Sequence, residues 1–216
     1  MSSNSRITRC LVWGGLLLII AGISGAFLWN NLSPAGKGAA HPLPVYGQVV
    51  DFTLTNQFGQ AVSLATFRGH LWLADIIFTR CPGPCSKMTK LMSELQAALP
   101  AKSPVKLVSL TTDPDFDTPS ILEMYGKRFK TDFQQWSFLT GDKRQIHRLA
   151  VGNLKLVLVE KEPDFRETPE DLFVHSTAIT LIDTQGRVRG IYETTESQSK
   201  QRILAAVTTL LNERTR

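Results

Sequence analysis

The feature that most constrains this chain is a pair of cysteines, Cys81 and Cys85, between a buried strand and a helix. The apolar residues 71–78 before the pair predict the strand, and residues 84–99 after it predict the helix. In such a turn a thiol meets the amide groups of a helix N-terminus, which lower its pKa and favour the thiolate. The thiolate is the form that attacks disulfides and binds metal ions. The pair therefore indicates a redox or metal-binding site rather than two ordinary buried cysteines.

The length and composition of the chain predict one domain of ordinary size, which contains the cysteine pair, and one additional segment outside that domain. The chain has 216 residues, of which 43% are hydrophobic and 20% are charged, and these values are typical of a globular protein. The net charge is +5, and because Lys and Arg are scattered along the chain, we expect no nucleic-acid partner. Three cysteines are too few for a disulfide scaffold.

An apolar run near the N-terminus predicts a membrane anchor. Residues 11–29 contain no charged side chain and are long enough for a helix that crosses a bilayer. Arg6 and Arg9 precede the run and no acidic residue does, which predicts a cytoplasmic N-terminus and an exported remainder. A cleaved signal peptide is the alternative, but its apolar region is usually shorter, and no evident Ala-x-Ala site follows this one. We expect an uncleaved single-pass anchor in a bacterial inner membrane, with the C-terminal domain in the periplasm, since a mitochondrial presequence is absent.

The chain is thus predicted to have four regions. Residues 1–10 form the cytoplasmic N-terminus, and residues 11–29 form the transmembrane anchor. Residues 30–44, rich in Gly, Ala, Pro and Asn, form a flexible tether, and residues 45–216 form the exported domain. Cys10 precedes the apolar run, whereas a lipoprotein cysteine would follow it, so we assign it no role.

Alternating segments within the exported domain predict its fold. Strands are expected at residues 51–55, 62–64, 71–78, 105–110, 136–139, 153–160, 177–182 and 188–192, and helices at 84–99, 117–130, 141–150 and 196–211. This order is typical of an α/β fold with a mixed central sheet flanked by helices. A strand, a cysteine turn, a helix and a second strand are also the start of a thioredoxin-like fold.

The cysteine pair needs a third partner if it is to hold a metal ion. An offset of four residues on a helix keeps both side chains on one face, and two thiolates form half of a site for copper or zinc. Among the four histidines, His41 lies in the tether, His70 in a turn and His147 on the expected solvent face of a helix. His175 lies where a core strand is predicted to begin. It is either a structural histidine or the missing ligand.

Four motifs follow one another in this domain. They are Cys81-x-x-x-Cys85, Asp113-Pro114-x-x-Asp117-Thr118-Pro119, Trp136-x-x-Leu139-Thr140-Gly141, and His175-Ser176 before a strand that ends in Asp183. Together they resemble the Sco/SenC family over roughly residues 45–211, and the single N-terminal anchor extends the resemblance. Members of that family are membrane-anchored, thioredoxin-like proteins that bind copper through two cysteines and a distant histidine. They assist assembly of the binuclear copper site of cytochrome c oxidase.

The resemblance implies a copper ion bound by Cys81, Cys85 and His175. Its implied partners are the copper-receiving subunit of a terminal oxidase and a second periplasmic copper carrier. We interpret Asp117 as a helix cap, and Asp113 as a residue beside the site. Family members commonly carry an acidic and then an apolar residue between the cysteines, whereas residues 82–84 here are Pro-Gly-Pro, which bears on the identity of the client.

Two functions are compatible with these residues. A copper metallochaperone would hold Cu(I) and pass it on by ligand exchange, and would need His175. A thiol–disulfide oxidoreductase would act through Cys81 and Cys85 on exported partner proteins and would not need the histidine. We predict the metallochaperone first; if the protein is an enzyme, we expect the oxidoreductase. A third, peroxidase-like interpretation would use Arg80 to activate Cys81.

Overall fold

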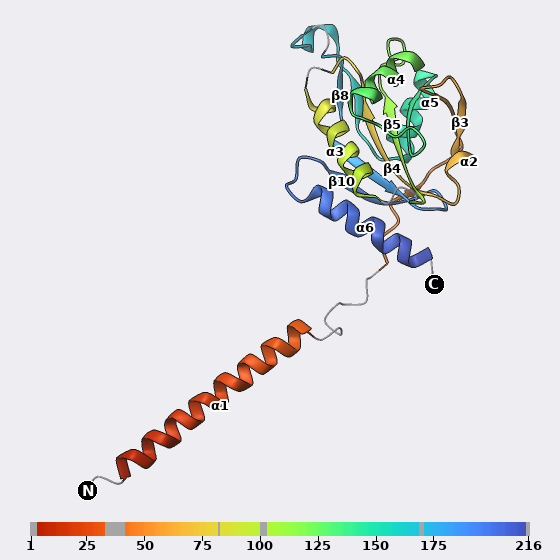
Figure 1. The fold of residues 1–216 in the computed structure, drawn as a ribbon. Coiled ribbons are helices and arrows are strands. Elements are labelled where there is room, and N and C mark those ends of the chain that lie inside the picture. The colour runs from red at the N-terminus through yellow and green to blue at the C-terminus, as the bar shows by residue number, and fades with distance from the viewer. Residues whose placement is uncertain (1–3, 33–41, 82, 100–102, 169–170, 215–216) are drawn as a thin grey trace. The chain divides into compact units, whose positions relative to one another are not determined.

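The computed structural model describes residues 4–32, 42–81, 83–99, 103–168 and 171–214 (Figure 1). The chain divides into two compact units, Met1–Pro42 and Leu43–Arg216. The second unit carries all the strands of the structure. It is also the unit in which the candidate site lies.

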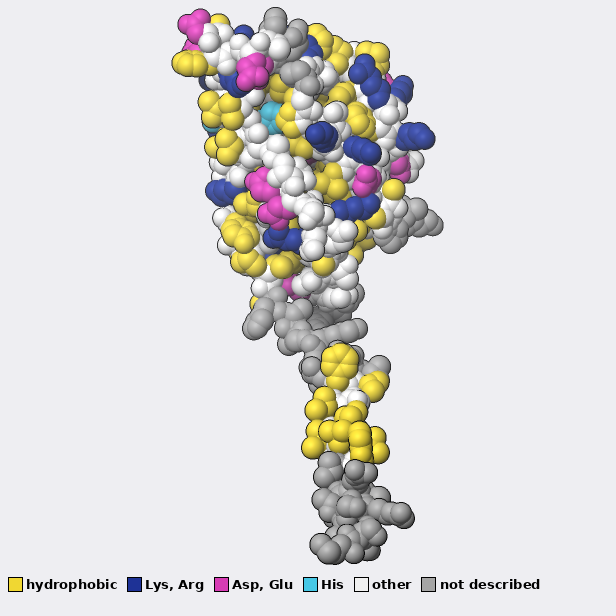
Figure 2. All heavy atoms as spheres, turned by 90° about the vertical axis from the view of Figure 1, so that its left-hand side faces the viewer, with side chains coloured by type: hydrophobic (Ala, Val, Ile, Leu, Met, Phe, Trp, Pro, Cys, Tyr) yellow, Lys and Arg dark blue, Asp and Glu magenta, His cyan; other side chains and the backbone are white. Residues whose placement is uncertain are grey.

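The first unit is one helix, α1 (Asn4–Leu32), which covers the apolar run. Figure 2 shows hydrophobic side chains over the visible face of the middle of this helix. Trp13, Leu18 and Phe27, for example, are 63%, 76% and 69% exposed. Among the residues that the structure describes, no helix is long and apolar enough to cross a membrane. The predicted tether at 33–41 lies outside the described residues.

An eight-stranded mixed sheet forms the centre of the second unit, in the order β1-β10-β9-β4-β5-β6-β2-β3. The three central strands β4, β5 and β6 are parallel, and the other pairs are antiparallel. The strands are β1 (Gly47–Gln48), β2 (Thr53–Asn56), β3 (Ala61–Ser63), β4 (Leu71–Ile77), β5 (Val105–Thr111), β6 (Trp136–Thr140), β9 (Ala178–Ile182) and β10 (Arg187–Glu193). The predicted mixed sheet is confirmed.

Helices cover both faces of this sheet. Buried side chains of α3, α4 and α6 pack on one face, and those of α2, α5 and a π-helical turn pack on the other. The elements are α2 (Leu64–Phe67), α3 (Pro84–Ala98), α4 (Pro119–Arg128), α5 (Lys143–His147), the π-helical turn (Arg148–Asn153) and α6 (Ser199–Arg214). Every residue of β4 is therefore buried, which explains why its sequence is an almost continuous apolar run.

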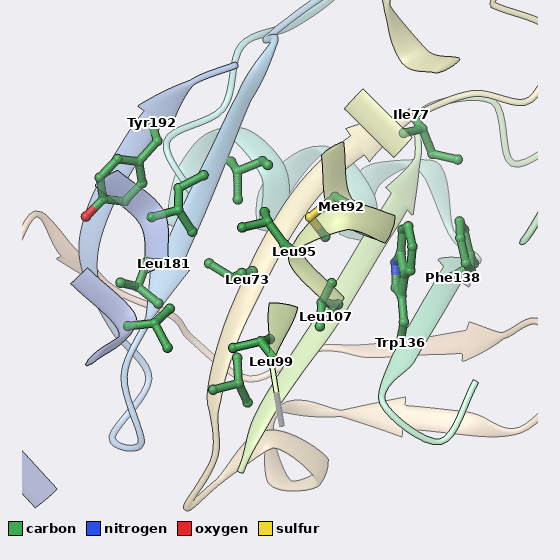
Figure 3. Close-up of a cluster of buried hydrophobic side chains, with 14 of the residues drawn as sticks. Leu73, Ile77, Met92, Leu95, Leu99, Leu107, Trp136, Phe138, Leu181 and Tyr192 are labelled. Atoms are coloured by element: carbon green, nitrogen blue, oxygen red, sulfur yellow. The ribbon is translucent and has the colours of Figure 1, made fainter. Parts of the chain in front are cut away.

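Helix α3, which carries Cys85, is held against the sheet by the buried hydrophobic cluster on that face (Figure 3). Leu73 of β4 and Leu107 of β5 belong to the same buried cluster as Met92 and Leu95 of α3. Each of these four side chains is fully buried. Because α3 begins immediately after the cysteine turn, this packing fixes where the helix presents Cys85.

The predicted strand at 153–160 is wrong in its first half. The chain leaves the π-helical turn at Asn153, and Lys155 has a left-handed backbone with a φ of 61°. Leu154 and Leu156 are both drawn into the second core cluster, so the chain bends there instead of running straight. Only Leu158–Glu160, strand β7, is extended.

Strand β7 pairs with β8 (Phe173–His175) in a separate two-stranded sheet. Neither this second sheet nor strand β8 was predicted from the sequence. His175 is therefore the last residue of β8 and does not begin a core strand, which was the expectation. The core strand β9 starts at Ala178. The loop between β7 and β8 contains a 3₁₀ turn at Pro163–Phe165.

Candidate metal centre

Three residues from separate elements meet at one end of β4. Cys81 lies in the loop after β4, Cys85 is the second residue of α3, and His175 ends β8. Their two sulfur atoms and one imidazole nitrogen all lie within 4.8 Å of one another. The fold thus brings together the two cysteines and a histidine that is 90 residues away from Cys85 in sequence.

The turn that carries the cysteines starts the helix in an ordinary way. Gly83 occupies the N-cap position and Pro84 the first helical position, where the missing amide hydrogen of proline removes no helical hydrogen bond. Cys85 is 1% exposed, whereas Cys81 is half-buried. Both thiols are free, and Pro82 lies outside the described residues.

The orientation of His175 makes one ring nitrogen available. Its Nδ1 lies 2.9 Å from the carbonyl oxygen of Ser176, and because a carbonyl can only accept, Nδ1 carries the proton. In the neutral imidazole, Nε2 is then unprotonated, and it lies 3.2 Å from the Sγ of Cys85. The edge-to-face contact of Phe78 with the imidazole, at 5.8 Å between ring centroids, holds the ring in this position. Metal-ligating histidines are commonly fixed in this way by a carbonyl on the other nitrogen.

The two thiols have opposite acidities. A hydrogen bond from the Cys85 thiol, stronger than the opposing effect of burial, lowers the pKa of Cys81 well below its ordinary value. The same hydrogen bond, together with burial, raises the pKa of Cys85. The thiolate form is therefore favoured at the half-buried Cys81 and the thiol form at the buried Cys85.

The site opens onto a cleft of about 490 Å³. Cys81 and His175 line it, while the buried Cys85 lies behind them. The apolar part of the lining comes from Phe78, Pro84, Phe173 and Val174, and the polar part includes Lys161, Glu167, Thr168 and Asp171. Any exchange of a bound ion with another protein would therefore take place on the side of Cys81 and His175.

Arg80 does not face Cys81 as an activating group. Its Nε and Nη2 donate to the Oδ2 of Asp113 at 3.1 and 2.7 Å, and its guanidinium lies 4.2 Å from the centre of the Phe116 ring. The charge is thus engaged by Asp113, which the sequence placed beside the site. This arrangement does not favour the peroxidase-like interpretation.

Asp117 is not the helix cap that the sequence predicted, because Thr118 occupies the N-cap position of α4. The Asp117 side chain instead accepts hydrogen bonds from the amide and hydroxyl of Thr79, at 3.1 and 2.5 Å, and from the hydroxyl of Thr111, at 2.5 Å. It is completely buried. The carboxylate therefore joins the residue that opens the cysteine loop to the end of β5.

The other histidines that the structure describes, His70 and His147, are not part of the cluster. His147 ends α5 and is exposed, as predicted, and the Nδ1 of His70 lies 3.2 Å from the carbonyl oxygen of Pro104. His41 lies outside the described residues. A residue that the sequence interpretation missed is Asp75, a fully buried aspartate in the middle of β4. Its signal was a single acidic residue within an apolar run.

The mixed sheet, with the two cysteines at the junction of β4 and α3, identifies the thioredoxin-like α/β fold. In this chain the fold carries a Cys-Cys-His cluster. The family model described as SCO1/SenC matches residues 45–212. The chain belongs to the SCO1/SenC family.

Two relatives and one solved structure illustrate this membership. The chain is 31% identical to the SCO1 protein homolog of Bacillus subtilis (strain 168) over 191 residues, which cover 88% of this chain and 95% of that one. It is 30% identical to a putative copper-binding protein of Stutzerimonas stutzeri over 152 residues, 68% of this chain and 70% of that one. The structure of BsSco, a member of the Sco family of cytochrome c oxidase assembly proteins in which a disulfide switch was identified, has 32% identity and a TM-score of 0.66. That match covers 79% of this chain and 95% of BsSco.

Proposed function

We propose that this protein is a copper metallochaperone that binds copper as cargo through Cys81, Cys85 and His175. The observation that carries the proposal is the meeting of two thiols and an imidazole nitrogen within 4.8 Å. A relative named as a copper-binding protein and a structural neighbour from a family of cytochrome c oxidase assembly proteins support it. The recipient we propose is the copper-receiving subunit of a terminal oxidase, and a second periplasmic copper carrier is the proposed donor.

The chemistry of the three side chains fits this cargo. Thiolates and imidazole suit copper, as they also suit zinc. The lowered pKa of Cys81 favours the thiolate that binds copper, and the contact of Nδ1 with the Ser176 carbonyl leaves Nε2 of His175 facing the cysteines. Cys85 still has to release its proton, so we expect copper binding to release a proton.

Reduced protein is expected to bind one equivalent of Cu(I), whereas protein oxidised to a Cys81–Cys85 disulfide should bind far more weakly. The reason is that a disulfide removes two of the three proposed ligands and leaves only His175. An anaerobic titration of the full-length protein, in competition with a chromophoric Cu(I) chelator, would measure both affinities. Equal binding by the oxidised and reduced forms would contradict the proposed ligand set.

We also propose that residues 11–29 anchor the protein in a bacterial inner membrane with residues 45–216 in the periplasm. The uncharged run, the preceding Arg6 and Arg9, and the exposed apolar side chains of α1 support this. The full-length protein is expected to stay in the membrane pellet after alkaline carbonate extraction, whereas a variant that keeps only residues 45–216 should be soluble. Extraction of the full-length protein into the supernatant would argue against the anchor.

A second candidate function, thiol–disulfide exchange, is favoured by the asymmetry of the two cysteines. Cys81 has the lowered pKa and opens to the cleft, as an attacking thiolate must. Cys85 is buried and keeps its proton, as a resolving thiol would before the second step. This function needs both cysteines but not His175, so substitution of the histidine separates the two candidates.

A further inference from the structure

The start of the cysteine loop is held by a short segment at the end of β5. Thr79, two residues before Cys81, donates both its amide and its hydroxyl hydrogen to Asp117. Arg80, the next residue, donates to Asp113. Both residues therefore bond to the turn at residues 113–117, which lies more than 30 residues away in sequence. This turn anchors the start of the cysteine loop.

Burying the carboxylate of Asp117 at this position is energetically unfavourable unless other groups stabilise it. It is completely buried, and among the described residues no Lys, Arg or His forms an ion pair with it. Burial raises its pKa, and the hydrogen bonds from Thr111 and Thr79 oppose that effect. A carboxylate without a cationic partner in such a place is destabilising unless several donors satisfy it. Here three donors converge on its two oxygens.

The three candidate ligands differ in how firmly they are held. Cys85 belongs to α3 and is packed in the core, and His175 is fixed by Ser176 and Phe78. Cys81 lies in the loop, where its amide donates to the carbonyl oxygen of Phe78 at 3.2 Å. The position of the Cys81 sulfur therefore depends most on how the preceding residues are anchored.

We propose that Asp117 is a positioning residue for the copper site. It fixes Thr79, and through Thr79 it sets where the Cys81 thiolate stands relative to Cys85 and His175. This inference rests on the proposed copper-binding function and adds a residue, distant in sequence from all three ligands, that controls the geometry of the site. Partners that orient metal ligands in this way typically change metal affinity when they are lost.

The test compares two threonines that donate to the same carboxylate in the full-length protein. Thr79→Val removes the hydroxyl on the cysteine loop, and Thr111→Val removes the hydroxyl on β5. We expect Thr79→Val to weaken Cu(I) binding about tenfold and to change the thiolate-to-copper absorption and EPR spectrum of the Cu(II) form. Thr111→Val should lower resistance to chemical denaturation and should disturb copper affinity and spectrum less than Thr79→Val, because it leaves both contacts of Thr79 with Asp117 in place, although it removes the acceptor of the Asp113 amide.

Two substitutions of Asp117 complete the experiment. Asp117→Ala should reproduce the spectral change of Thr79→Val if it folds. Asp117→Asn should keep the wild-type spectrum. The asparagine oxygen can accept from the Thr79 amide and the Thr111 hydroxyl, while its amide group donates to the Thr79 hydroxyl. That rescue would show that position, and not charge, is what Asp117 supplies.

Equal effects of Thr79→Val and Thr111→Val on copper affinity, or an unchanged spectrum in Thr79→Val, would overturn the positioning role. A wild type that binds no copper would instead overturn the proposed function. In that case the positioning role can still be tested by the alkylation rate of Cys81 in the metal-free protein, measured by peptide mass spectrometry. Thr79→Val should change this alkylation rate more than Thr111→Val does; equal rates in all three proteins would overturn the positioning role.

Discussion

Replacing His175 with alanine is expected to weaken Cu(I) binding by more than the ~10–100-fold that loss of an outer-shell partner costs. The substitution removes the Nε2 that lies 3.2 Å from the Sγ of Cys85. No other histidine of the described chain lies in the cluster, so no replacement ligand of this type is at hand. Competition with a Cu(I) chelator under anaerobic conditions would measure the change.

His147→Ala provides the matched control. His147 is exposed at the end of α5 and belongs to no metal cluster among the described residues, so its loss should leave copper affinity unchanged. Both variants remove one imidazole, which separates the effect of position from the effect of composition. Copper affinity of His175→Ala equal to that of His147→Ala would rule out His175 as a ligand.

The same variant separates the two candidate functions. Reduction of a model protein disulfide needs the thiolate of Cys81 and the thiol of Cys85, and neither is removed in His175→Ala. A variant that loses copper binding but keeps disulfide reduction would show that both activities reside on one cysteine pair. If the wild type reduces disulfides and binds no copper, the oxidoreductase becomes the function and His175 becomes structural.

The central elements of the fold could be predicted because their signals are local. The apolar run at 71–78 became β4, and the helix predicted at 84–99 became α3, whose buried side includes Met88, Met92 and Leu95. The β7–β8 pair could not be predicted in this way. Its strands have three residues each, and Leu158 pairs with His175 across 16 intervening positions that no local pattern connects.

The candidate site was predictable to a similar depth. The spacing of Cys81 and Cys85 is a local signal. His175 stood out from the other histidines by its position, but the resemblance to a family was needed to assign it as a ligand and not as a structural residue. Asp117 was misinterpreted as a cap because Asp-Thr-Pro before a helix is a common start signal, and its real partner, Thr79, lies 38 residues earlier. Such long-range hydrogen bonds leave no trace in sequence spacing.

Asp75 is the most unusual buried group in the core. It lies in β4 opposite Ser109 of β5, whose hydroxyl donates to its Oδ1 at 2.6 Å and accepts from the indole of Trp136 at 3.0 Å. Its second oxygen, Oδ2, has no hydrogen-bond partner within the described part of the chain. Burial raises the pKa of Asp75 from 3.8 to about 7, while the hydrogen bond from Ser109 opposes the shift.

This raised pKa predicts a specific dependence of stability on pH. Between about pH 4 and pH 7 the folded protein holds a proton on Asp75 that the unfolded chain has released, so the free energy of unfolding falls as the pH rises. Above the folded pKa both states are ionised and the slope from this group disappears. The folded protein is then left with a charged carboxylate of which one oxygen has no partner.

Asp75→Asn is therefore expected to become more favourable relative to the wild type by about 3 kcal/mol between about pH 4.5 and pH 8. The asparagine cannot ionise, so it avoids the growing cost of the buried charge at the higher pH. Its amide nitrogen faces the position of Oδ2 without a partner, which destabilises the variant by about 1–3 kcal/mol, but equally at both pH values. Urea denaturation of the reduced, metal-free protein at the two pH values would measure the difference.

Val108→Ala is the control for this experiment, because it removes buried methyl groups from β5 without changing any charge. It should lower the free energy of unfolding by a similar amount at both pH values. A difference between Asp75→Asn and the wild type that stays constant with pH would mean that Asp75 has the same pKa folded and unfolded. In that case the buried carboxylate would have to be stabilised as an anion by more than its one bond to Ser109. Such a result would contradict the physical account of the core given by the burial of Asp75 and the unpaired Oδ2.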